Sequence, residues 1–131
     1  YSHANHLIIP SFDFDGNLKW TSCIEKESDT SFFRGNTISI GQDGDLYLIF
    51  NDKKTRKERS KINAKNKFGD TFTDFARINS TGEVDMRKII LNSQETGIYF
   101  SPHNSSYIGN GMILLFGRDN KSARHGLLKL P

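Results

Sequence analysis

Two separate segments of the chain recur at one spacing, and this recurrence restricts the possible folds more than any other feature of the sequence. The segment Ser11–Leu18 matches Arg77–Val84 with the turn glycines 66 residues apart, and Leu46–Phe50 matches Met112–Phe116 at the same spacing. A spacing shared by two independent segments indicates an internal repeat. One structural unit is therefore expected to occur more than once in the 131 residues.

Turn signals separate the recurring segments and predict hairpins. Asp-Gly and Asn-Gly pairs favour two-residue turns, because both central residues of such a turn need positive φ. The pairs Asp43-Gly44 and Asn110-Gly111 are 67 residues apart, which a one-residue difference in loop length would explain. The expected hairpins are Leu7–Phe14 with Asn17–Ile24, Phe33–Ile40 with Leu46–Phe50, and Phe72–Ile78 with Glu83–Leu91. The last unit is expected over Ser105–Phe116, with an outer strand at Gly126–Leu130.

These hairpins predict an all-β fold. Strands rich in Ile, Leu, Phe and Tyr lie between turn residues, and no stretch keeps a helical period. Two hairpins per unit give an antiparallel four-stranded sheet, the blade of a β-propeller, and the continuous apolar runs fit middle strands packed on both faces. We expect a single domain fragment with blade parts 1–30, 31–92 and 93–131. Because propellers have at least four blades, about two units belong either to a larger ring or to an open array.

One hairpin carries a resemblance to known families. The segment Pro10–Trp20 combines an Asp, a Gly turn and a Trp, and it resembles the outer hairpin of quinoprotein-like repeats and of the Asp-box repeats of sialidases. The Asp-box residues are present with extra residues between them: Ser11, Asp13, Gly16 and Trp20. The second copy, Arg77–Met86, lacks the Asp and the Trp. Most of the chain is also similar to the carboxy-terminal part of secreted propeller-like proteins of the Bacteroidetes.

That second resemblance implies a setting rather than functional residues. It implies a periplasmic, extracellular or cell-surface location and a role as an accessory subunit of an outer-membrane secretion or uptake complex. The remaining blades would then lie in the same chain or in a partner chain.

The most distinctive polar feature is a basic segment, Lys53–Lys67, which has eight basic residues to one acidic residue. It is longer than the matching connection at 119–125, so we interpret it as an insertion, and long loops often carry function. It lacks the aromatic residues on which single-stranded nucleic acids stack. A solvated loop, an acidic protein partner, and nucleic acid or anionic lipid are the alternatives. The residues assigned to a contact are Lys53, Lys54, Arg56, Lys57, Arg59 and Lys61.

The sequence predicts no catalytic group, no cofactor and no metal site. Asp13 and Asp15 precede Gly16 as in part of a calcium loop, but a third acidic ligand is missing, which favours a role in the turn. The two carboxylates would also point to opposite faces of a strand. The four histidines have no second pair of ligands nearby: His3, His6, His103 and His125. Cys23 is the only cysteine, which excludes a disulfide within the chain.

The predicted function is a non-catalytic module that binds a protein partner. The net charge of +3 does not require a nucleic-acid partner, and the longest apolar run is far shorter than the roughly 20 residues of a membrane helix. The alternatives are nucleic-acid binding through 53–67, and a propeller enzyme (a glycoside hydrolase or a quinoprotein) with its active site in other blades. For such an enzyme, the candidate channel residues are Arg34, Tyr47 and Tyr107.

Overall fold

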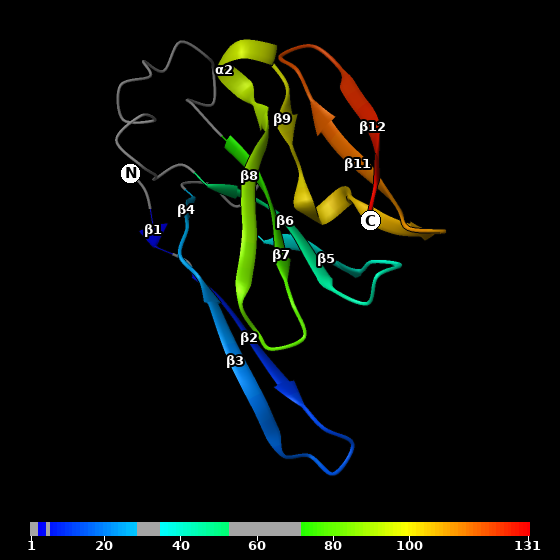
Figure 1. Cartoon of the computed structure of the whole chain (residues 1–131). Helices are drawn as coiled ribbons and strands as arrows, with labels where there is room; N and C mark the ends of the chain where they lie inside the picture. Colours follow the sequence, from blue (N-terminus) through cyan, green and yellow to red (C-terminus); the bar gives the residue numbers. More distant parts are fainter. Residues whose placement is uncertain (1–2, 5, 29–34, 53–71) are drawn as a thin grey trace.

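The computed structural model describes residues 3–4, 6–28, 35–52 and 72–131, and these form antiparallel β-sheets (Figure 1). The only helical elements in this part of the chain are the four-residue helix α2 (Ser93–Thr96) and the short 3-10 helix η2 (Pro102–Asn104). The all-β prediction is therefore confirmed. The basic segment 53–67 and Arg34 lie outside the described residues.

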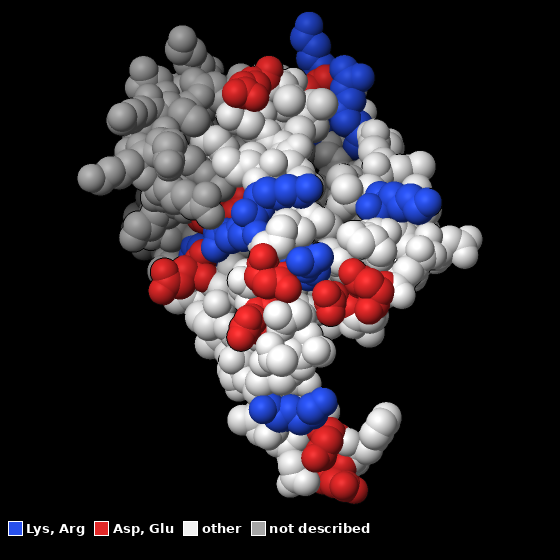
Figure 2. All heavy atoms as spheres, in the orientation of Figure 1, with Lys and Arg blue, Asp and Glu red and all other residues white. Residues whose placement is uncertain are grey.

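The first layer is a two-stranded ribbon that we call the N-terminal hairpin. Strand β2 (Leu7–Phe12) pairs with β3 (Leu18–Ile24), and the short strands β1 (His3–Ala4) and β4 (Glu27–Ser28) pair beyond them. Residues along β2 alternate between partly buried and exposed, as expected for a strand with one packed face. The turn at the tip projects away from the rest of the molecule (Figures 1 and 2).

The second layer, which we call the central sheet, has four strands in sequence order: β5 (Asn36–Ile40), β6 (Leu46–Asp52), β7 (Phe72–Ile78) and β8 (Val84–Asn92). Every residue of β6 after the first is buried. A strand can be buried on both faces only if other layers cover it on both sides. The continuous apolar run at 46–50 is thus a middle strand in the middle layer.

The third layer, which we call the C-terminal sheet, is centred on β11. Its strands are β9 (Tyr99–Phe100), β10 (Ser106–Gly109), β11 (Met112–Arg118) and β12 (Ala123–Lys129). β12 pairs with the whole length of β11, so β9 and β10 share the opposite edge of β11, each at one end. The C-terminal sheet is therefore three strands wide, where the central sheet is four.

Two apolar clusters join the three layers. Between the N-terminal hairpin and the central sheet, the buried residues are Ile24, Leu48, Phe50, Ala76 and Ile78. Between the central and C-terminal sheets, they are Tyr47, Ile49, Phe75, Phe100, Ile113 and Leu130. Neighbouring residues of β6 enter opposite clusters because side chains alternate along a strand.

Two hairpins match residue by residue at the spacing of 66. Phe12 opposes Leu18 after a register shift in the N-terminal hairpin, and Ile78 opposes Val84 after a register shift between β7 and β8. Their turns also match, since Gly16 has φ 85° and Gly82 has φ 88°. The two hairpins thus share register, bulge and turn.

Two-residue turns were predicted for two hairpins, and one prediction is wrong. Asn110 and Gly111 both have positive φ, 55° and 70°, as such a turn requires. In the turn of the β5–β6 hairpin, only Gly44 has a positive φ, of 87°. The amide of Gly41 donates to the carbonyl of Asp45, so the loop is longer than two residues. There the carboxylate of Asp43 accepts the amide of Asp45, which stabilises the longer turn.

Side-chain directions revise the second sequence match. At a spacing of 66, Tyr47 corresponds to Ile113, yet these two residues meet in one cluster and so point in opposite directions. At a spacing of 67, Leu46 corresponds to Ile113, and both point toward the preceding layer. The pairing agrees, because Ile40 opposes Leu46 and Tyr107 opposes Ile113. A shift of one residue turns every side chain to the other face, so the spacing of these strands is 67.

Candidate binding site at the edge of the C-terminal sheet

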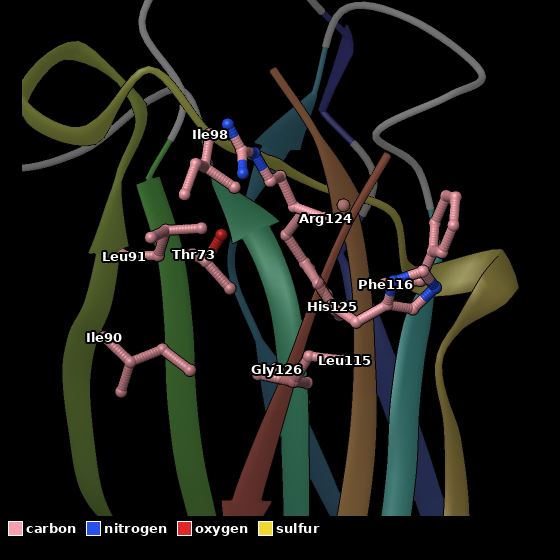
Figure 3. A pocket seen from close by; sticks show the side chains of 11 residues that line it. Thr73, Ile90, Leu91, Ile98, Leu115, Phe116, Arg124, His125 and Gly126 are labelled. Carbon is pink, nitrogen blue, oxygen red and sulfur yellow. The ribbon is translucent and has the colours of Figure 1, made fainter. Parts of the chain in front are cut away.

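A pocket of roughly 190 Å³ lies between the central and C-terminal sheets. Ile90, Leu91 and Thr73 form the wall on the central sheet (Figure 3). The other lining residues are Ile98, Phe100, Leu115, Phe116, Gly117, Arg124, His125 and Gly126. Figure 3 shows the rings of Phe116 and His125 turned away from the pocket, and their centroids lie 5.2 Å apart. The walls are mainly apolar, and Arg124 contributes a cationic side chain.

Two glycines shape the pocket on the side of the C-terminal sheet. A Cβ added at Gly126 would have no heavy atom within 4 Å. The lack of a side chain at this position therefore leaves open space in the pocket. A Cβ at Gly117 would lie 2.5 Å from the carbonyl oxygen of Tyr99, so this position needs glycine for the close approach of β9. The pocket is therefore bounded by backbone on one side and branched side chains on the other.

Asp119 positions Arg124. The Arg124 guanidinium contacts the Asp119 carboxylate through Nη2 at 2.8 Å and Nε at 2.9 Å, and 57% of its side chain is exposed. The same carboxylate accepts the backbone amides of Lys121 and Ser122, each at 2.7 Å. These two amides and the guanidinium hold the pKa of Asp119 well below its usual range. Arg124 is thus ion-paired with Asp119 at the pocket, and more than half of its side chain is exposed.

Among the described residues, no strand pairs with the outer edge of β12 beside the pocket. Leu130 donates to the carbonyl of Gly111 at 2.6 Å, and Asp119 donates to the carbonyl of Ser122 at 3.0 Å. Because hydrogen-bonding direction alternates along a strand, the even-numbered residues of β12 bond to β11, and His125, Leu127 and Lys129 direct their amides outward. In the described part of the chain β12 pairs with β11 alone. A regular edge of this kind is a template for a further strand.

In the central sheet, the side chain of Arg87 on β8 lies on the face toward the N-terminal hairpin. Its Nε donates to Asp74 at 2.7 Å and its Nη2 to Asp52 at 2.6 Å, and both carboxylates are almost fully buried. The guanidinium also lies 5.0 Å from the centre of the Phe50 ring, and its Nη1 donates to the Glu25 carbonyl at 3.0 Å. Arg87 therefore ties β8 to β6, to β7 and to the N-terminal hairpin.

Of the candidate channel residues, the structure describes two. Tyr47 is fully buried, stacks on Phe75 at 5.3 Å and donates its hydroxyl to Asp43, and burial raises its pKa. Tyr107 is 45% exposed, and its hydroxyl accepts the amide of Gly111. Each hydroxyl makes a hydrogen bond to the turn of its own hairpin, so the two tyrosines support turns. Arg34 and the contact residues predicted between Lys53 and Lys61 lie outside the described residues.

The carboxylate of Asp13 stabilises a turn. It accepts the amides of Asp15 and Asn17, each at 2.9 Å, and the bond from Asn17 is the main reason that the pKa of Asp13 is lowered. Asn79 accepts the amides of Thr81 and Glu83 in the matching turn without any charge. Among the residues that the structure describes, no group of three or more His, Cys, Asp or Glu could hold a metal ion.

Charges do not form a single-sign patch on the face shown in Figure 2, where the described acidic and basic side chains are interspersed. None of the helices within the described ranges is long and apolar enough to span a membrane. Comparison of the chain with protein-family models, with curated proteins and with solved structures finds no match.

The pocket and edge were not predicted from the sequence. The alternation of β12 is weak, because Arg124, His125 and Gly126 interrupt its apolar residues. In the structure, the central sheet has four strands in sequence order, whereas among the described residues β12 pairs with β11 alone.

Proposed function

We propose that this chain is a non-catalytic, protein-binding module made of propeller-like blades, with parts at 1–30, 31–92 and 93–131. The supporting observation is that the N-terminal hairpin packs on the central sheet through the same positions by which β7 and β8 pack on the C-terminal sheet. At the spacing of 66, Trp20 and Ile24 correspond to Met86 and Ile90, and each pair faces the following layer. Successive blades of a propeller are related by one such repeated step.

The two outermost layers leave apolar side chains uncovered. On the N-terminal hairpin, Ile8, Phe12 and Leu18 are 58–67% exposed. On the outer face of the C-terminal sheet, Leu127 is 61% exposed and opposes Leu114. Contiguous exposed apolar residues of this kind mark interaction surfaces. They support a continuation of the stack by further blades, in this chain or in a partner, as a ring or as an open array.

An interaction role fits the chemistry of the described residues better than a catalytic one. Their most deeply buried ionic cluster, around Arg87, is closed on itself by internal ion pairs. The location in the cell envelope rests on the family resemblance and stays a prediction, as does contact through Lys53–Lys61.

The single cysteine provides the test of this proposal. Cys23 is exposed and opposes Ile8 on the outer face of the N-terminal hairpin, so its reactivity reports whether that face is covered. The rate of maleimide labelling would be measured for the isolated chain and for the native protein extracted from its source. If another layer covers the hairpin, labelling of the native protein is at least tenfold slower. Equal rates would refute the proposal.

A matched control separates coverage from a general loss of reactivity. In a Cys23→Ser background, Phe14→Cys places the thiol at the projecting tip, where the natural side chain is fully exposed. This thiol is expected to react at similar rates in both samples. Slow labelling at both positions would show aggregation rather than coverage, and would count against the proposal.

A further inference from the structure

We propose that Asn110 is a site of spontaneous deamidation, that the hydroxyl of Tyr107 slows this reaction, and that the isoaspartate product loosens strand β10. The inference is independent of the proposed function, because it concerns the covalent chemistry of a single turn. It follows from the two residues of the β10–β11 turn, from the hydrogen bonds that hold them, and from the register of the two strands.

The turn places an unhindered backbone nitrogen next to an unbonded side-chain amide. Asn110 is exposed, and within the described part of the chain its side chain makes no hydrogen bond. Gly111 follows it and has no Cβ, so its own side chain cannot shield its backbone nitrogen. Asparagine is a chemically labile residue. Attack of the Gly111 nitrogen on the Cγ atom of Asn110 is therefore the covalent change that this turn favours.

The reaction needs only water. The Gly111 nitrogen gives up its proton and bonds to Cγ of Asn110, the Cγ–Nδ2 bond breaks, and Nδ2 leaves as ammonia with that proton. Water then opens the resulting succinimide at one of its two carbonyls, which leaves either aspartate or isoaspartate at position 110. One water is consumed and one ammonia is released, and nothing is oxidised or reduced.

Tyr107 opposes the first step. The amide of Gly111 donates to the hydroxyl of Tyr107 at 3.0 Å, and the carbonyl of Gly111 accepts the amide of Leu130 at 2.6 Å. A hydrogen bond donated by the amide stabilises its protonated form and so opposes loss of the proton. The nitrogen can attack only after it leaves Tyr107, so the rate of deamidation depends on local opening of the turn.

Asn79 in the β7–β8 turn provides the comparison. Its Oδ1 accepts the amides of Thr81 and Glu83 and the hydroxyl of Thr81, so its side chain is held in place. The residue after it is Ser80, whose Cβ crowds the attacking nitrogen. Both features should make deamidation slower at Asn79 than at Asn110.

The isoaspartate product changes the geometry of the hairpin. Isoaspartate routes the main chain through the side-chain carbon, which adds one backbone atom to the turn. Tyr107 opposes Ile113 and Gly109 opposes Met112, with a register shift already present between these pairs. β10 has only four residues, so a further displacement leaves few pairs to hold it. The product should therefore lose the pairing of β10 with β11.

The first test compares the unchanged chain with Tyr107→Phe. Both would be incubated folded at mildly alkaline pH, and peptide mass spectrometry would follow the conversion of amide to acid at Asn110 and Asn79. In the unchanged chain, we expect conversion at Asn110 at least tenfold faster than at Asn79. Tyr107→Phe should accelerate conversion at Asn110 at least threefold and leave Asn79 unchanged. An Asn110 no faster than Asn79 would overturn the site, and equal rates at Asn110 in both proteins would overturn the role of Tyr107.

Because Tyr107→Phe could loosen the whole fold, a second measurement uses the unchanged protein. Hydrogen exchange of the Gly111 amide, followed by NMR, should be at least tenfold slower than in the urea-unfolded chain. Exchange at the unfolded rate would show that Tyr107 does not hold this amide, and would overturn its role whatever the variant does.

The last test concerns the product. The isoaspartate form would be separated by ion exchange and compared with freshly prepared Asn110→Asp, which has the same charge and no added backbone atom. Hydrogen exchange over Ser106–Gly109 should be at least tenfold faster in the isoaspartate form than in Asn110→Asp. Equal exchange in the two forms would overturn the loosening of β10.

Discussion

The central sheet and the C-terminal sheet have corresponding strands but differ in how they end. The central sheet ends in β8, whose Arg87 joins two buried carboxylates, an aromatic ring and a carbonyl of the neighbouring layer. The C-terminal sheet ends in β12, whose Arg124 makes one exposed ion pair beside an open pocket. The comparison shows that the fourth strand does more than extend a sheet, because it also closes the gap between layers.

The first prediction concerns the two arginines and carries the largest expected effect. Arg87→Met removes the guanidinium from two buried carboxylates, and the loss of such a partner costs about 3–5 kcal/mol of unfolding free energy. Arg124→Met breaks an exposed pair and should cost less than about 1 kcal/mol. Urea denaturation of both variants measures the difference. Similar losses of unfolding free energy in the two variants would contradict the predicted difference between Arg87 and Arg124.

The second prediction concerns the attachment of the N-terminal hairpin. Trp20 packs in the cluster with the central sheet, and its indole donates to the carbonyl of Ser80 at 3.1 Å. Trp20→Ala should therefore lower the unfolding free energy by about 2–4 kcal/mol. Phe14→Ala, at the exposed tip, should change it by less than about 0.5 kcal/mol. Thermal denaturation of both variants tests this, and an unaffected Trp20→Ala variant would mean that the hairpin adds little to the stack.

The third prediction contrasts the two glycines of the pocket. Gly117→Ala brings a Cβ to 2.5 Å from a backbone oxygen, so β9 must move, at a cost of about 1–3 kcal/mol. Gly126→Ala meets no atom and should stabilise the strand by about 0.5 kcal/mol, because alanine loses less conformational entropy than glycine on folding. Chemical denaturation distinguishes the two. A stable Gly117→Ala variant would show that β9 does not constrain the pocket.

The fourth prediction compares the matching turns and has the smallest effect. The pKa of Asp13 in the folded chain lies below its unfolded value, so its contribution to stability is present above about pH 4 and is lost as the pH falls through the folded pKa. Asn accepts the same amides in the turn at Asn79 without titrating. Asp13→Asn should therefore lower Tm by no more than about 2 °C at pH 7, and the gap should close or reverse at pH 2.5. Calorimetry at both pH values checks this, and a gap that widens in acid would contradict it.

The strands and turns were largely predictable. The strand predicted at Phe72–Ile78 has those bounds, and the one predicted at Glu83–Leu91 is shifted by one residue at each end. The strand predicted at Gly126–Leu130 begins three residues earlier, at Ala123, because Arg124 and His125 look like loop residues until β11 is present to pair with them. β9 was missed because two residues carry no detectable period.

By itself, the sequence determined the all-β class, the hairpin turns and the spacing of 66 that relates two hairpins, because turn residues and alternating strands act locally. Tertiary structure alone decided which side chains of each middle strand point toward the preceding layer. Leu46–Phe50 and Met112–Phe116 are uninterrupted apolar runs, so the sequence pattern looks the same after a shift of one residue. Tertiary structure also decided that Arg87 is enclosed and Arg124 open. That difference depends on whether a neighbouring strand is present to bury the charge, and no local pattern records it.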